Sequence, residues 1–99
     1  MVTYEVNLQV DAAIAGEYRA WLRAHVAELL ALPGFVDATV FDVHAPVEPG
    51  RAGLCVHYRL RDRAALERYL AEDAPRMREQ GLARFGGRFS ATRRVLLAG

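Results

Sequence analysis

The side chains of this sequence that are best placed to transfer protons centre on His57. Arg59 follows two residues later in the same alternating segment, and Glu5 lies in an alternating segment near the start of the chain. If these segments are neighbouring strands, Glu5 stands beside His57, and a histidine next to a carboxylate is a pairing that acid–base catalysis uses. His57, Glu5 and Arg59 are therefore candidate catalytic residues. The alternative is an ionic ladder that fixes strand register or a dimer.

A second group of candidates lies in the stretch after the opening segment. His25 falls four residues after Trp21, on the apolar side of a predicted helix that also carries Tyr18. These three residues are candidates for a ligand pocket. A half-buried histidine that bonds to a nearby carbonyl or carboxylate is the plainer interpretation of His25. Asn7 and Arg94, on the polar side of their strands, are further candidates for ligand binding.

Nucleophilic and metal chemistry have weaker support. Cys55 and His57 are two residues apart on one strand, so their side chains point the same way about 6–7 Å apart, which exceeds a hydrogen bond. Cys55 is predicted to be a small, half-buried packing residue, and His44 is a weaker candidate at a strand end. Three scattered histidines and one cysteine show no recognised ligand spacing, so neither a metal site nor a cofactor is predicted.

Arginines gather in the second half of the chain. They suit the recognition of a carboxylate or phosphate, so an anionic small ligand is conceivable. A solvated or dimer-bridging ionic surface is the plainer interpretation. The residues concerned are Arg76, Arg78, Arg84, Arg88, Arg93 and Arg94.

Hydrophobic periodicity predicts the elements that position these residues. In chain order they are a strand over 3–10, a helix over 12–31 capped by Asp11, strands over 35–44 and 54–60, a helix that begins after Asp62 and is interrupted at Pro75, and a strand over 89–97. This βαββαβ order is typical of an α+β, ferredoxin-like fold. We expect an antiparallel sheet with strand order 4-1-3-2 and both helices on its apolar face, which includes Val36.

The opposite face of this sheet is predicted to be polar, and it carries Glu5, Asn7, His57, Arg59 and Arg94. Water can cover such a face, or a second copy can pack against it and close a barrel. We expect the second arrangement, a homodimer through the polar sheet face. Phe41 would add an apolar component to the contact.

Length and composition indicate a single soluble domain over residues 1–99, with 53% hydrophobic residues and a net charge of +1. No apolar run approaches the ~20 residues that a bilayer requires, and no export signal opens the chain. The single cysteine cannot close an intrachain disulfide. We therefore expect a cytoplasmic protein with no membrane partner.

The two halves of the chain differ in charge. Residues 1–50 hold 2 arginines and 7 acidic residues, whereas residues 51–99 hold 11 arginines and 5 acidic residues. Interleaving of their strands would neutralise this difference. The same topology serves RNA-recognition modules, which stack bases on aromatic residues of the central strands. The matching positions here carry no aromatic ring, so no nucleic-acid partner is predicted.

Several segments give the chain a family resemblance. They are Tyr-Glu-Val-Asn-Leu-Gln-Val-Asp at 4–11, Trp-Leu-Arg-Ala-His at 21–25, Leu-Pro-Gly-Phe at 32–35 and Ala-Arg-Phe-Gly-Gly-Arg-Phe-Ser-Ala-Thr-Arg-Arg-Val-Leu at 83–96. The sequence resembles a small bacterial family of uncharacterised proteins, similar in architecture to the dimeric α/β-barrel superfamily. That superfamily includes cofactor-free antibiotic-biosynthesis-type monooxygenases, muconolactone-isomerase-like enzymes and ligand-sensing modules. The resemblance implies the fold and the dimer, and it implies no particular reaction.

Three functions are consistent with these observations. The first is the binding of a small molecule. The second is a cofactor-independent monooxygenase or isomerase, in which His57, Glu5 and Arg59 handle protons while Trp21 and His25, with Tyr18, line the cavity. The third is a purely structural interaction module, in which side chains fill that space.

Overall fold

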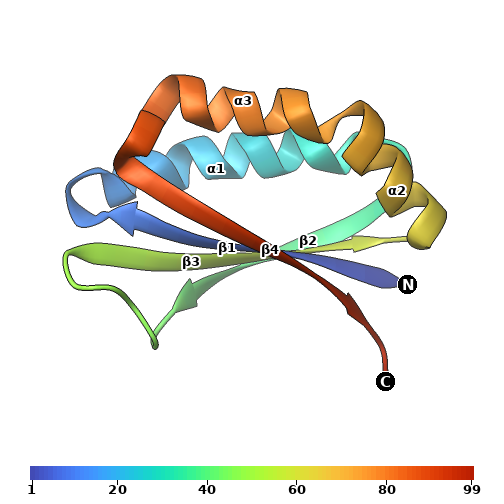
Figure 1. Cartoon of the computed structure of the whole chain (residues 1–99), viewed down its shortest axis with the longest axis horizontal. Helices are drawn as coiled ribbons and strands as arrows, with labels where there is room; N and C mark the ends of the chain where they lie inside the picture. Colours follow the sequence, from blue (N-terminus) through green and yellow to red (C-terminus); the bar gives the residue numbers. More distant parts are fainter.

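The computed structural model describes all 99 residues, Met1–Gly99, as a four-stranded sheet with the helices on one side (Figure 1). No helix is both long enough and apolar enough to cross a lipid bilayer. Single 3-10 turns cover Ala12–Ile14 and Gly86–Arg88. The other elements, in chain order, are β1 (Val2–Asp11), α1 (Ala15–Leu30), β2 (Phe35–Val43), β3 (Arg51–Leu60), α2 (Arg63–Glu72), α3 (Ala74–Phe85) and β4 (Phe89–Leu97).

The sheet has the order β2-β3-β1-β4, which is the predicted order 4-1-3-2 read from the other edge. All neighbouring strands are antiparallel, so the ferredoxin-like α+β fold is confirmed. Between the central strands, Glu5 lies opposite His57 and Asn7 lies opposite Cys55. On the other side of β1, Glu5 lies opposite Arg94. The polar side chains predicted from alternation therefore share one face.

β2 departs from the predicted alternation at its start. A bulge between Phe35 and Asp37 shifts its register against β3. Because a bulge inserts one extra residue into a strand, the side chains on either side of it no longer alternate regularly. The prediction that Val36 faces the helices is therefore wrong: Val36 is 47% exposed, and Phe35 packs against Tyr58 in its place.

The two helix starts differ in their capping. A 3-10 turn precedes α1, and Asp11 makes no side-chain capping bond, contrary to the prediction. The Asp11 carboxylate lies instead 3.4 Å from Nε of Arg51. Asp62 does cap α2, since its Oδ1 accepts a hydrogen bond from the N–H of Ala65 at 2.8 Å. Pro75 lies in the first turn of α3, where its missing N–H is harmless, so the predicted interruption separates two helices.

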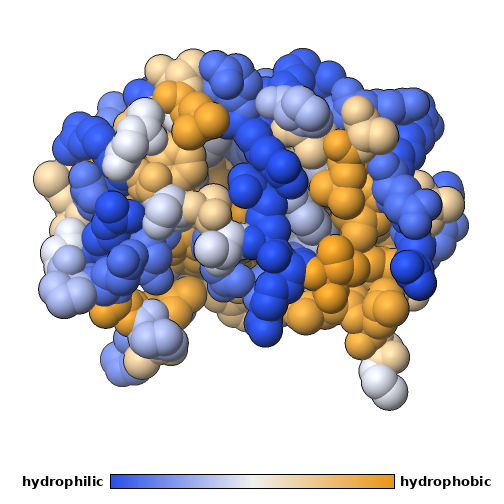
Figure 2. All heavy atoms as spheres, in the orientation of Figure 1, coloured by the Kyte–Doolittle hydropathy of each residue, from blue (hydrophilic) through white to orange (hydrophobic).

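The core lies between the helices and the sheet, where 19 buried hydrophobic residues form one cluster. Val10, Val56 and Leu60 have no exposed surface, and burying such a side chain contributes about 1.5–3 kcal/mol. The other face of the sheet has no helical cover (Figure 1). Figure 2 shows apolar side chains over the C-terminal part of β4, where Val95 is 49% exposed and Leu97 is 55% exposed.

Candidate functional site

The polar face of the sheet is organised around the carboxylate of Glu5. Its Oε1 accepts hydrogen bonds from Nε of Arg94 at 2.6 Å and from Nδ2 of Asn7 at 2.8 Å. Its Oε2 accepts a hydrogen bond from Nε2 of His57 at 2.7 Å. These donors come from β4, β1 and β3, so the strand register builds the arrangement. We call these four residues the outer-face cluster.

The outer-face cluster keeps Glu5 charged. Hydrogen bonds from Arg94 above all, and from Asn7 and His57, lower the pKa of Glu5 from 4.5 to about 2, although burial opposes them. A carboxylate with so low a pKa, whose oxygens already accept three hydrogen bonds, is a poor proton acceptor at neutral pH. The geometry therefore favours an ionic cluster that fixes register over a catalytic pair.

Arg59 lies outside the outer-face cluster. Two of its guanidinium nitrogens donate to the two carboxylate oxygens of Asp37 on β2. The structure therefore brings His57 and Glu5 together as predicted but does not bring Arg59 to them. Arg94, predicted as a ligand-binding residue, supplies the guanidinium group at Glu5.

Cys55 lies beside the outer-face cluster. Its Sγ, a ring nitrogen of His57 and an oxygen of Glu5 lie within 4.8 Å of one another, a spacing that could hold a metal ion. Burial and the charge of Glu5 raise the pKa of the Cys55 thiol, so at neutral pH the sulfur keeps its proton and is a poor ligand and nucleophile. Arg94 already compensates the charge of Glu5.

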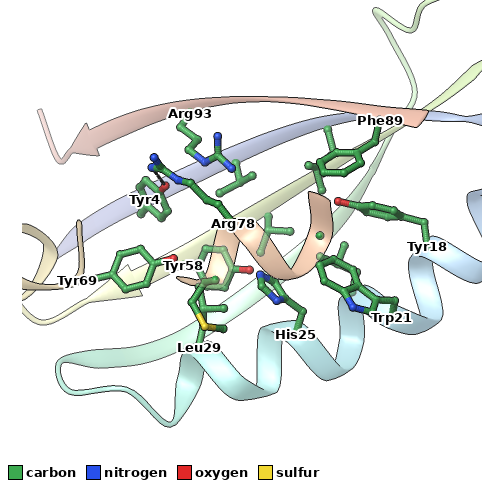
Figure 3. Close-up of a pocket in the computed structure, with 16 residues that line it drawn as sticks. Tyr4, Tyr18, Trp21, His25, Leu29, Tyr58, Tyr69, Arg78, Phe89 and Arg93 are labelled. Carbon is green, nitrogen blue, oxygen red and sulfur yellow. Dashed lines mark hydrogen bonds between the residues drawn. The ribbon is translucent and has the colours of Figure 1, made fainter. Parts of the chain in front are cut away.

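A separate pocket lies on the opposite face of the sheet, between the sheet and helices α1 and α3 (Figure 3). The space inside it measures about 50 Å³, and 12 of its 16 lining residues are hydrophobic. A pocket with such walls suits a flat, apolar group. We call it the aromatic pocket, because six tyrosine, tryptophan and phenylalanine rings line it in addition to the imidazole of His25: those of Tyr4, Tyr18, Trp21, Tyr58, Tyr69 and Phe89.

One wall of the aromatic pocket is a stack of Trp21 on His25, one turn apart on α1. Their ring centres are 4.5 Å apart and their planes are inclined by 20°. Gly81 of α3 faces this wall closely: a Cβ there would lie 3.2 Å from the Trp21 ring and 3.4 Å from the Phe89 ring. The absence of a side chain at Gly81 therefore keeps the pocket open.

His25 is held in a defined state. Burial lowers its pKa, so the ring is neutral at pH 7. Its Nδ1 lies 3.3 Å from Oε1 of Gln80, whose Nε2 lies 3.9 Å from Sδ of Met77. With the amide in this orientation, Nδ1–H of His25 donates to Gln80, and Nε2 of the ring keeps a lone pair. His25 can therefore accept a proton or a hydrogen bond in the aromatic pocket.

Polar groups at the aromatic pocket come mainly from phenols and arginines. Nη2 of Arg78 donates to the Tyr4 hydroxyl at 3.1 Å, and Arg93 lies on the same side (Figure 3). Burial raises the pKa of Tyr18 and Tyr69 to about 12. These phenols keep their protons at physiological pH and act as neutral hydrogen-bonding groups.

The predicted site residues thus fall into two groups on opposite faces of the sheet. Trp21, His25 and Tyr18 line the aromatic pocket, whereas His57 and the rest of the outer-face cluster lie beyond the strands. The combined site considered from the sequence, with His57 acting in a cavity lined by Trp21, is not formed within one chain. Sequence reasoning did not identify Gln80 or Gly81, because α3 has no motif that marks either residue.

A second hollow of about 210 Å³ lies between α1 and β2. The Arg19–Asp42 ion pair, 2.6 Å between Nη2 and Oδ1, belongs to its lining. Only three of its six lining residues are hydrophobic, and none is aromatic. The aromatic pocket is smaller, but its lining holds the aromatic rings and His25, which the second hollow lacks.

Solved structures define the class of this fold. A Deinococcus radiodurans protein assigned by name to the antibiotic biosynthesis monooxygenases is 17% identical with a TM-score of 0.74, over 100% of this chain and 93% of that one. SnoaB, a cofactor-independent oxygenase from Streptomyces nogalater, is 16% identical with a TM-score of 0.69, over 98% and 92%. The de novo designed protein Foldit4 is 13% identical with a TM-score of 0.62, over 99% and 98%. The chain therefore has the fold of the antibiotic biosynthesis monooxygenases.

The chain belongs to the family described as a domain of unknown function, DUF4286, whose model matches residues 1–98. No match was found among curated proteins. The family description names no reaction, and structural likeness at these identities concerns the fold alone. The function must therefore be argued from the site.

Proposed function

We propose that this protein binds a small, flat and mostly apolar molecule in the aromatic pocket. The supporting observation is the enclosure of one space by six aromatic rings from the sheet and the helices, with Gly81 leaving room beside Trp21. Aromatic walls bind flat ligands by stacking and by the removal of apolar surface from water.

Binding of this kind requires a small adjustment of the pocket. Its volume of about 50 Å³ is well below the roughly 300–1,000 Å³ of established ligand pockets. Arg78 is exposed, and Met77 beside it has a flexible side chain. Movement of these two α3 side chains would enlarge the pocket for a flat ring system without a change in the fold.

The proposal can be tested through Trp21, the single tryptophan of the chain. We expect 2-naphthol, a flat neutral probe, to quench its fluorescence in a saturable manner. Gly81→Val, which fills the space beside Trp21, should weaken binding at least ten-fold. Gly16→Val is the matched control, because a Cβ at Gly16 meets no atom within 4 Å. Absence of saturable quenching in the unmodified protein would contradict the proposal, and so would equal binding by the two variants. Either result would favour a role as a purely structural interaction module.

A second candidate function is cofactor-independent chemistry on a ligand in the same pocket. The observation that favours it is the neutral ring of His25, whose Nε2 lone pair is free to remove a proton. A flat carbon acid such as anthrone would give a delocalised carbanion. Dioxygen could oxidise this carbanion, so that anthrone and O2 yield anthraquinone and water. Alternatively, a proton could return to the carbanion at another carbon, as in an isomerase.

This chemistry is tested with anthrone by following anthraquinone absorbance and oxygen consumption together. We expect His25→Gln, which keeps a polar side chain but no base of suitable pKa, to lower the rate at least ten-fold while anthrone still binds. A rate no faster than that without protein would reject the enzyme and leave the binding function standing.

We also propose that a second copy of the chain covers the outer face of the sheet. The buried carboxylate of Glu5 and the 44% exposed ring of Phe41 lie on this face. Removal of Phe41 from water would stabilise the contact. The free thiol of Cys55 supports a reducing, cytoplasmic location for this dimer.

A further inference from the structure

Most arginines of this chain are paired with carboxylates. Of the 13 basic residues, all arginine, nine form ion pairs. The four arginines without such a partner are Arg23, Arg63, Arg78 and Arg93. Two of these four, Arg78 and Arg93, line the aromatic pocket. Two unpaired guanidinium groups therefore meet at one apolar site.

The two arginines reach the aromatic pocket from different layers. Arg78 comes from α3 and bonds through Nη2 to the Tyr4 hydroxyl at 3.1 Å. Arg93 comes from β4, where it lies opposite Val6 on the face that the helices cover. Figure 3 shows their side chains close together at the Tyr4 side of the pocket, away from Trp21. The two guanidinium groups therefore converge at one end of the pocket.

The lining of the aromatic pocket contains no aspartate or glutamate. Two phenols of the lining stay neutral, because burial raises the pKa of Tyr69 to about 12 and also raises that of Tyr58. The pocket thus has an excess of positive charge at the Tyr4 end and the rings of Trp21 and Phe89 at the other (Figure 3). A guanidinium group forms paired, charge-assisted hydrogen bonds with a carboxylate.

We infer that the ligand of the aromatic pocket is a small flat carboxylic acid. Its ring lies against Trp21 and Phe89, and its carboxylate is bound by Arg78 and Arg93. This inference rests on the proposed binding function and specifies the ligand class. The six arginines noted in the sequence thus form two groups. Arg94 and three others form ion pairs with carboxylates of the chain itself, whereas Arg78 and Arg93 form none and are available to bind a ligand.

The experiment compares two probes of equal shape, 2-naphthoate and its neutral amide 2-naphthamide, through Trp21 fluorescence. We expect the acid to bind at least ten-fold more tightly than the amide, and added NaCl to weaken only the acid. Arg78→Met and Arg93→Met, which keep an apolar stem, should each remove most of this preference. Arg63→Met is the matched control, because Arg63 is also unpaired but lies outside the pocket at the start of α2.

The outcomes separate the two proposals. Equal binding of acid and amide, unchanged in Arg78→Met and Arg93→Met, would overturn the carboxylate inference and leave the aromatic pocket as a binding site. Absence of binding by both probes would overturn the binding function itself. Circular dichroism and urea unfolding of each variant establish that a loss of binding does not reflect a loss of folding.

Discussion

Glu5 is a carboxylate that is only 5% exposed in the middle of the sheet. A buried charge is tolerated when its hydrogen-bonding capacity is satisfied and an opposite charge is near. Asn7, His57 and Arg94 meet both requirements. Loss of the Glu5 charge would leave Arg94 without its partner on this face.

Protonation of Glu5 in acid should therefore lower the free energy of unfolding. The pKa of Glu5 is about 2 in the folded protein and 4.5 in the unfolded reference, so its contribution is complete above about pH 5 and is lost as the pH falls towards about 2. We expect the free energy of unfolding to fall by about 2 kcal/mol over this pH range. This is less than the pKa difference alone would give, because solvent screens the pairing of Glu5 with the exposed Arg94. Urea unfolding as a function of pH measures it.

Glu5→Gln is the control for this acid effect, since glutamine keeps the shape of the side chain but does not titrate. Its unfolding free energy should be lower at neutral pH and should change less between about pH 5 and about pH 2. Parallel pH profiles for the two proteins would show that other carboxylates carry the acid sensitivity.

Replacement of His57 tests whether the outer face of the sheet and the aromatic pocket act independently. His57→Ala removes one hydrogen bond to Glu5 and should lower stability by about 1 kcal/mol. Binding of 2-naphthol should stay within about two-fold of the unmodified value, because His57 does not line the aromatic pocket. A large loss of affinity in a folded His57→Ala protein would place His57 in the ligand site after all.

Part of the outer-face cluster and part of the aromatic pocket could be predicted from the sequence. His57 and Glu5 were predicted neighbours because strand alternation and the βαββαβ order place them in register. Arg59 rather than Arg94 was predicted to lie beside Glu5, but Arg94 lies directly opposite Glu5, whereas Arg59 lies opposite Asp37 and binds it. A long, flexible side chain has several possible partners, and a pattern of residue types does not select among them.

At the element scale, the order of the elements was predicted more accurately than their ends: β3 begins at Arg51, three residues before its predicted start, and α1 begins at Ala15, three residues after its predicted start. Unbroken alternation in the first strand is a strong signal, and β1 spans Val2–Asp11 as a result. The bulge at Val36 left no signal, because a bulge depends on tertiary pairing with β3. The predicted position of the helices over the apolar face is confirmed (Figure 1), but no pattern in the sequence indicated that Gln80 pairs with His25.

The two aspartates that precede helical segments provide a test of local capping. Asp62→Ala should destabilise the protein by about 1 kcal/mol, because the N–H of Ala65 loses the acceptor at 2.8 Å. Asp11→Ala is the matched control, since its side chain caps no N–H and its ion pair with Arg51 is partly exposed, so we expect a smaller change. Thermal unfolding compares the two variants, and an equal loss in both would contradict the assignment of the cap.

At the scale of the whole molecule, the fold does not select a function. A cofactor-independent oxygenase and a designed protein both share this architecture with the chain. The features of this chain that bear on function are an aromatic pocket with two arginines that form no ion pair, and an outer face with a charged cluster. The strand order also places basic β4 and β3 on either side of acidic β1, which joins the unlike halves of the sequence.

Association of two molecules through the outer face is the final prediction. We expect the protein to sediment as a dimer at micromolar concentration. Phe41→Asp should shift it to a monomer, because a carboxylate would replace the apolar ring that lies against His57 on this face. Leu82→Asp is the matched control: Leu82 is 53% exposed on α3, in the opposite layer, and its replacement should leave the dimer intact. A monomeric unmodified protein would reject the barrel, and dissociation by Leu82→Asp alone would place the contact on the helices.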